Sequence, residues 1–190
     1  MSDTPLAAQG RAGDAAIAAP LLAERARSLS RLLKFELQFR ADAPFPATAR
    51  DVTYDRQLAF TGFSLPESTV AAGGVLPVET HWRRAAAADR QFMIQLVLRD
   101  TEGKAVFSVV RHLGYLLYPV AEWPADTPVR ETYRLVVPSH IRPGAYSLGL
   151  RAAWWRDGPL ALCEPDDPRL REQGLIVPLG RITVTGPRAR

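Results

Sequence analysis

A mainly β fold is predicted by three features of this 190-residue sequence. From residue 51 onward, apolar and polar residues alternate with a period of two, as in strands that bury one side. Gly, Pro and Asp residues separate these alternating segments at short intervals and predict turns. No helical pattern lies between the segments to carry a parallel crossover. Residues 51–186 are therefore predicted to form an antiparallel β-sandwich, with a strand density typical of immunoglobulin-like domains.

The residues before the sandwich have a different pattern. Residues 1–14 are rich in Ala, Gly and small polar types, which predicts a disordered tail. In residues 15–39 the apolar positions recur at steps of three and four, which predicts an amphipathic helix with basic residues between them. The end of this segment, residues 35–39, also alternates, so a short strand is the alternative there. Residues 40–50 contain two prolines and predict a linker.

The strands of the predicted sandwich follow in order along the chain. Residues 52–65 predict one or two strands, and a glycine pair precedes a strand at 75–83. In that strand every second residue from Leu76 to Trp82 shares a face, which makes Trp82 a candidate core residue. Further strands are predicted at 91–99, 104–112, 129–137, 145–155, 159–163 and 175–185.

The residues that connect these strands predict two hairpin turns, an irregular segment and a polar loop. Turn residues at 100–103 predict a hairpin, and the turn at 140–144 predicts a second hairpin between the strands on either side of it. The segment 113–127 is irregular and aromatic, and residues 164–174 predict a polar loop. Residues 187–190 are a short tail.

Charge and composition argue against a nucleic-acid partner, an intramolecular disulfide and a membrane-spanning helix. Lys and Arg exceed Asp and Glu by 24 − 20 = 4, and the excess is spread along the chain, so nucleic acid is not predicted as a partner. The single cysteine, Cys163, cannot form an intramolecular disulfide. No stretch approaches the ~18 apolar residues of a membrane-spanning helix. We expect a cytoplasmic protein, with attachment to a membrane surface as an alternative.

The residues that usually carry catalysis lack the required spacing. His81, His112 and His140 show no metal-ligand pattern, and Ser139 lies directly beside His140 without a nucleophile elbow. No glycine-rich loop is placed to hold phosphates. The sequence therefore predicts no enzyme, no catalytic residue, no metal and no cofactor. A catalytic site built from dispersed residues stays a third hypothesis, and a calcium site in the acidic loop 164–167 is an alternative for that loop.

Aromatic residues are the strongest signal for a binding site. They gather in the irregular segment, and the tandem pair at 154–155 places one indole on each face of a strand. Sandwiches hold sugar rings on exposed aromatic side chains with hydrogen-bond donors beside them. The alternative is that these side chains seal the end of the sandwich. The candidate ligand-binding residues are Tyr115, Tyr118, Trp123, Trp155 and Arg151.

The predicted helix is a candidate docking element. A basic amphipathic face can bind a partner protein or an anionic membrane, or it can cover an exposed edge of its own sandwich. Acidic residues lie among the basic ones, which favours packing on protein. The candidate partner-docking residues are Arg25, Leu29, Leu32 and Leu33.

From Val52 onward, the order of turns and core positions resembles a β-sandwich module at the C-terminus of multi-pass membrane glycosyltransferases of the mannosyltransferase type. It is also similar, more distantly, to the polysaccharide-recognising C-terminal domain of O-antigen exporter ATPases. The matching segments are LAFTGFSL (58–65), VETHW (78–82), FMIQLVLRDTEGKAV (92–106), VRETYRLVVP (129–138), RPGAYSLGLRAAW (142–154) and LGRITV (179–184). The resemblance implies a noncatalytic accessory domain in cell-surface polysaccharide or glycolipid assembly, without the membrane-embedded catalytic part.

A second resemblance is local. Residues 29–45 are similar to a stretch of bacterial glycerol-3-phosphate acyltransferases, whose chemistry needs an aspartate five positions after a histidine. The corresponding positions here hold Ala86, Leu117 and Ala145, so that chemistry is missing. The leading hypothesis is thus a noncatalytic module that recognises a glycan or a glycan-assembly protein. The alternative is a structural subunit that docks through its helix onto a larger, membrane-bound complex.

Overall fold

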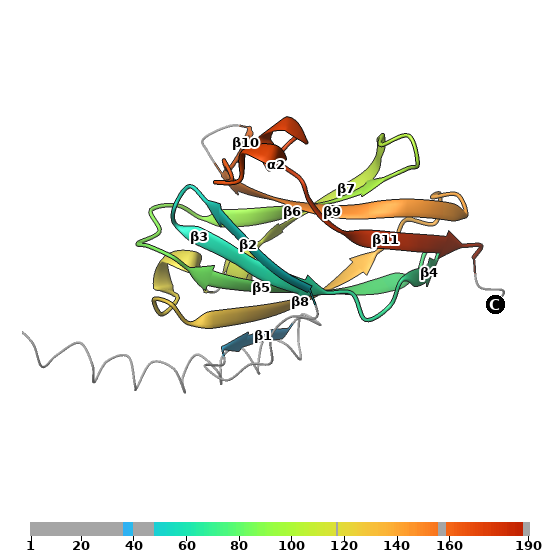
Figure 1. The fold of residues 1–190 in the computed structure, drawn as a ribbon. Helices are drawn as coiled ribbons and strands as arrows, with labels where there is room; N and C mark the ends of the chain where they lie inside the picture. Colours follow the sequence, from blue (N-terminus) through green and yellow to red (C-terminus); the bar gives the residue numbers. More distant parts are fainter. Residues whose placement is uncertain (1–35, 40–47, 117, 156–158, 188–190) are drawn as a thin grey trace, which may run out of the picture.

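The described part of the chain forms two β-sheets that pack face to face (Figure 1). A computed structural model describes residues 36–39, 48–116, 118–155 and 159–187, with the backbone alone for 36–39, 115 and 116. The strands are β1 (Glu36–Phe39), β2 (Thr48–Tyr54), β3 (Leu58–Ser64), β4 (Thr69–Ala71), β5 (Val75–Arg84), β6 (Phe92–Arg99), β7 (Ala105–His112), β8 (Pro128–Val136), β9 (Gly144–Trp155), β10 (Leu160–Leu162) and β11 (Val177–Thr185). The helical turns are η1 (Leu113–Leu116), η2 (Val120–Glu122) and α2 (Pro168–Glu172).

The two sheets divide the strands between them. Sheet A has the order β1-β8-β5-β3-β2. Sheet B has the order β4-β11-β9-β6-β7, and β10 pairs with one end of β9. This arrangement confirms a mainly β, two-sheet fold.

The core lies between the sheets, where the predicted alternation places it. Every second residue of β5 from Leu76 to Trp82 is 0% exposed, and the same holds to within 1% for β6 from Phe92 to Leu98. The Trp82 indole Nε1 donates a hydrogen bond to the Thr80 hydroxyl at 2.8 Å, so the buried N–H is satisfied. The Trp82 ring packs on Phe60 with 4.8 Å between centroids. Trp82 is therefore a core residue, as predicted.

The prediction of helix as far as residue 39 is wrong for its last residues, where the alternative of a short strand is confirmed. Glu36–Phe39 form β1, which pairs antiparallel with β8, with Leu37 opposite Glu131. The edge of β8 would otherwise leave its backbone N–H and C=O groups unpaired, and a strand at 36–39 can pair with them. The alternation of apolar and polar residues in this stretch also suits a strand. The tail 1–14, the rest of the predicted helix and its docking residues lie outside the described residues.

Two further boundaries differ from the prediction. The linker was expected to reach residue 50, but β2 begins at Thr48 and pairs with β3, with an irregular register between Ala49 and Val52. The polar loop contains α2, which starts where the Asp167 carboxylate accepts the Arg169 N–H at 2.9 Å. An Asp at the N-cap followed directly by a proline is a helix start that the loop interpretation missed.

The predicted hairpin of β8 and β9 is also wrong. The hairpin of β6 and β7 is confirmed, but β8 pairs with β5 and β1 in sheet A, whereas β9 pairs within sheet B. The connection 137–143 therefore crosses between sheets. Alternation looks the same in either sheet, so it does not identify a strand's neighbours.

The fold is not wholly antiparallel. The unpredicted strand β4 pairs in parallel with β11, with Thr183 opposite Thr69. A strand of three residues is too short to show a period. It covers part of the β11 edge, which would otherwise expose unpaired backbone groups.

One carboxyl group lies inside the core. Glu131, at an inward position of β8, is 0% exposed. Its Oε1 accepts the Gly114 N–H of η1 at 2.6 Å, while Oε2 has no hydrogen-bond partner among the described residues. Burial raises the pKa of Glu131 from 4.5 to about 8, and the Gly114 contact only partly opposes this. Glu131 is therefore protonated in the folded chain at neutral pH.

This burial predicts a pH-dependent stability. Above pH 4.5 the unfolded chain releases the Glu131 proton, whereas the folded chain keeps it until about pH 8, so the free energy of unfolding falls as pH rises through this window. Glu131→Gln keeps the shape and removes the titration. We expect the variant to match the parent near pH 4 and to be more stable near pH 8 in chemical denaturation. Equal pH slopes for parent and variant would contradict the assignment, and Glu102→Gln is the exposed control.

Candidate functional site

Strand β9 carries the predicted site residues that reach solvent. Its inward residues, such as Leu150 and Ala152, belong to the core, and its outward residues include Arg151 and Trp155. Trp155 is 60% exposed, whereas Trp154 packs against the core. The prediction that the tandem tryptophans face opposite sides is confirmed. We call the solvent side of sheet B its outer face.

A row of hydrogen-bonding side chains crosses the outer face over three strands. Arg151 of β9 lies opposite Gln95 of β6, and its Nε donates to Gln95 Oε1 at 2.7 Å. Gln95 Nε2 donates in turn to Ser108 Oγ of β7 at 3.0 Å. Both atoms of the Gln95 amide are therefore oriented by neighbours. Arg151 uses one of its five N–H donors in this row, so the terminal guanidinium nitrogens keep donors for a ligand.

Apolar side chains border this row on the Trp155 side. Leu160 of β10 lies opposite Trp155, and Leu162 lies opposite Ala153. Residues directly opposite in a ladder share a face, so the indole lies in a partly exposed apolar area. Trp155 and Arg151 are four residues apart on one strand, or about 13 Å. The outer face thus combines an exposed aromatic ring with oriented polar groups.

In the irregular segment, the described candidate side chains, Trp123 and Tyr118, give no such surface. Trp123 is 0% exposed, and its Nε1 donates to the Tyr118 carbonyl at 2.9 Å. Tyr118 is 7% exposed, its hydroxyl donates to the Glu122 carbonyl, and burial raises its pKa to about 12. Both rings fill the core, which corrects their assignment as ligand-binding residues. The Tyr115 side chain lies outside the described residues.

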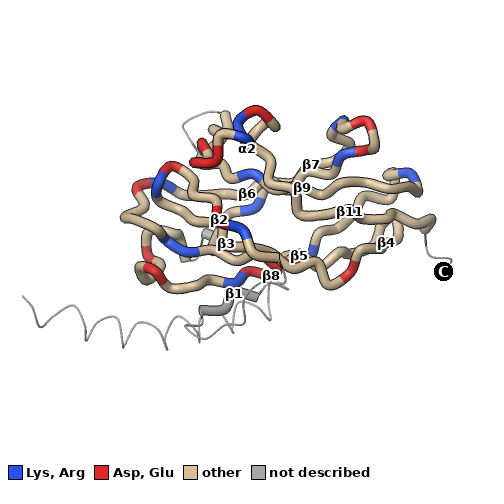
Figure 2. The backbone as a smooth tube through the Cα atoms, viewed as in Figure 1, with Lys and Arg blue, Asp and Glu red and all other residues tan. Residues whose placement is uncertain are grey.

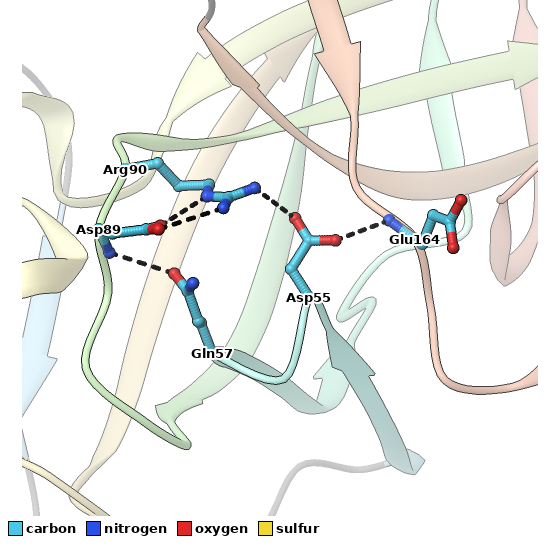
Figure 3. A network of polar contacts seen from close by, with 5 residues as sticks. All are labelled: Asp55, Gln57, Asp89, Arg90 and Glu164. Carbon is cyan, nitrogen blue, oxygen red and sulfur yellow. Dashed lines mark hydrogen bonds and ion pairs between the residues drawn. The ribbon is translucent and has the colours of Figure 1, made fainter.

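A polar network at the edge of the sandwich was not predicted (Figure 3). Asp55, at the end of β2, accepts Arg90 Nη1 at 3.1 Å through one oxygen and the Glu164 N–H at 3.2 Å through the other. Arg90 also binds Asp89, and these hydrogen bonds lower the pKa of Asp89 to about 2. Gln57 completes the network by accepting the Asp89 N–H. In the sequence these residues appear only as charged residues in turns, and that pattern does not identify which of them pair.

The network surrounds an open cleft of about 560 Å³, lined by Thr53, Asp55, Arg56, Arg90, Glu164, Pro165, Asp166 and Arg171. Its charges balance, and most of them pair within the protein. The Arg90 guanidinium also stacks over the Trp154 ring, 4.7 Å from its centroid. We interpret the network as a clamp that joins β2 to the segment after β10.

The acidic loop has structural roles in this clamp. Asp166 Oδ1 accepts the Thr53 N–H at 2.9 Å, Asp167 caps α2, and Glu164 lies 3.8 Å from Arg171. Among the described residues, no group of three His, Cys, Asp or Glu side chains is arranged to hold a metal ion. Burial raises the pKa of the nearby Cys163 thiol, so this cysteine stays protonated.

Comparisons with known proteins identify no family. No family model matches the sequence, and no curated protein matches it. These two comparisons therefore give no support to the resemblance to membrane glycosyltransferases or to acyltransferases. Among solved structures, the chain is similar to the C-terminal domain of Wzt, with a TM-score of 0.45 and 8% identity over 78% of this chain and 84% of that chain. Within the described ranges, no helix is long and apolar enough to cross a membrane.

The clamp predicts a specific loss of stability. Asp55→Asn removes the charge that faces Arg90, and Asn tolerates the left-handed backbone of this position (φ 50°). We expect the free energy of unfolding to fall by about 1–3 kcal/mol, because a hydrogen-bonded charge pair is broken. Glu102→Ala, at an exposed turn, is the control and is expected to change it by less than about 0.5 kcal/mol. Equal stability of parent and Asp55→Asn in urea titrations would refute the clamp.

Proposed function

We propose that this chain is a noncatalytic, immunoglobulin-like β-sandwich module that recognises a glycan in cell-surface polysaccharide or glycolipid assembly. The outer face of sheet B is its binding surface. The observation that carries the proposal is the exposed indole of Trp155 on the same face as the row Arg151, Gln95 and Ser108.

The chemistry of a sugar matches this surface. A pyranose has an apolar face that stacks on an aromatic ring and hydroxyls that both donate and accept hydrogen bonds. The row supplies donors from Arg151 and both kinds of group from Gln95 and Ser108. Because these side chains are held by one another before a ligand arrives, less conformational entropy is lost on binding.

The same groups argue against catalysis at this face. An arginine stays protonated at neutral pH, and a glutamine amide does not titrate, so neither can exchange a proton with a substrate. Ser108 is hydrogen-bonded to Gln95, which is not a base that could activate it. The surface is suited to binding a ligand and leaving it unchanged.

The role of Trp155 is tested by binding measurements on single variants. Titration calorimetry with polysaccharides purified from the producing organism is expected to show binding by the parent chain. Trp155→Ala is expected to weaken it at least about tenfold, because a buried tryptophan contact is commonly worth more than 1.4 kcal/mol. Val136→Ala is the matched control, since Val136 is 52% exposed on sheet A. Binding that is unchanged in Trp155→Ala, or absent from the parent, would contradict the proposal.

A further inference from the structure

The strands of sheet B carry a one-sided charge. The described strands β4, β6, β7, β9, β10 and β11 contain no Asp or Glu, but they contain arginines at positions 99, 111, 151 and 181. Sheet A is mixed, with Asp51 and Glu79 among its arginines. Figure 2 shows this contrast, with acidic residues near sheet B confined to its turns and to the α2 region.

Three of these arginines lie on the outer face. Arg151 belongs to the polar row described above. Arg99 of β6 and Arg181 of β11 both lie opposite Ser147 of β9, one on each side. Ser147 is an exposed outward residue of β9, so the two arginines share its face.

No acidic side chain neutralises them in the part of the chain that the structure describes. Four other arginines there pair with carboxylates, namely Arg83 with Asp126, Arg90 with Asp55 and Asp89, Arg130 with Glu79, and Arg171 with Glu164, whereas some, such as Arg134, form no ion pair. Arg99, Arg151 and Arg181 form no such pair. Asp100 follows Arg99 directly, but its Oδ1 is held by the N–H groups of Glu102 and Lys104 in the turn.

Arg99 and Arg151 lie within each other's field, and Arg99 has a buried donor without a partner. Burial, and next the charge of Arg99, lower the pKa of Arg151, so the two guanidinium groups repel. Arg99 Nε is buried and has no hydrogen-bond partner among the described residues. Like charges placed close together cost free energy, and an anion bound at Arg151 would reduce that cost.

The segment after α2 sets where such an anion can approach. A Cβ at Gly149 would lie 2.3 Å from Ile176, so Ile176 covers the outward side of β9 between Ser147 and Arg151. Arg151 therefore lies on the same side of Ile176 as Trp155. A ligand stacked on Trp155 reaches Arg151 first, and the other arginines add longer-range attraction.

We propose that the glycan bound by this face is acidic, and that a carboxylate, phosphate or sulfate group on it pairs with Arg151. This inference rests on the proposed function and narrows it to a ligand class. The terminal nitrogens of a guanidinium bind such groups through two parallel hydrogen bonds. The absence of acids from the whole sheet favours an anionic ligand over a neutral one.

The test separates polysaccharides of the producing organism into acidic and neutral fractions by anion exchange and titrates each into the parent chain. We expect the acidic fraction to bind at least about tenfold more tightly at low salt, with the difference shrinking as salt screens the charges. Arg151→Gln is expected to remove most of this difference. Arg134→Gln is the control, because Arg134 is an exposed arginine on sheet A.

The outcomes distinguish the two proposals. Binding of the neutral fraction as tight as that of the acidic fraction, still lost in Trp155→Ala, overturns the acidic ligand and keeps the glycan function. Binding of neither fraction overturns both. Binding of anionic phospholipid vesicles through Arg151, with neither fraction bound, also overturns both and assigns the arginines to a membrane surface.

Discussion

Two β-sheets that share one apolar interior impose a single constraint on this chain: along every core strand, alternate side chains belong to the interior. The row from Leu76 to Trp82 on β5 and the row from Phe92 to Leu98 on β6 meet this constraint with almost no exposed area. The intervening positions are then free to differ, and the two sheets use them differently. Sheet A carries charges of both signs, whereas sheet B carries arginine without acid. The candidate binding surface is thus a consequence of where the core lies.

Several polar groups beside the core are held by specific partners. At the sandwich edge, Asp55 and Arg90 join the end of β2 to the loop before β6 and to the segment after β10. The Arg90 guanidinium also stacks on the Trp154 ring, so the clamp holds the inward indole of the tandem pair in place. Glu131 is held differently, because its burial keeps a proton on the carboxyl in place of a countercharge. The clamp holds β9 at Trp154, while Trp155 on the outer face remains exposed.

Much of the fold follows from periodicity, and the errors have identifiable causes. Strand positions and the burial of Trp82 were predictable because alternation is a local property. The partners of β8 and β9 were not, since a hairpin and a crossing between sheets leave the same pattern in the sequence. The outward positions of Trp155 and Arg151 follow from alternation along one strand, whereas the contacts of Gln95 and Ser108 need the register across three strands. Trp123 was misassigned because an aromatic residue in an irregular segment can equally fill the core.

The indole N–H signals of the four tryptophans give the most direct test, because each reports on a different part of the molecule. In a two-dimensional nitrogen–proton NMR titration with the acidic polysaccharide fraction, we expect a large shift for Trp155. We expect little change for Trp82 and Trp123, which lie in the core, or for Trp154, on which Arg90 stacks. A shift of the Trp154 signal with Trp155 unchanged would place the ligand in the cleft at the clamp and would contradict binding on the outer face of sheet B.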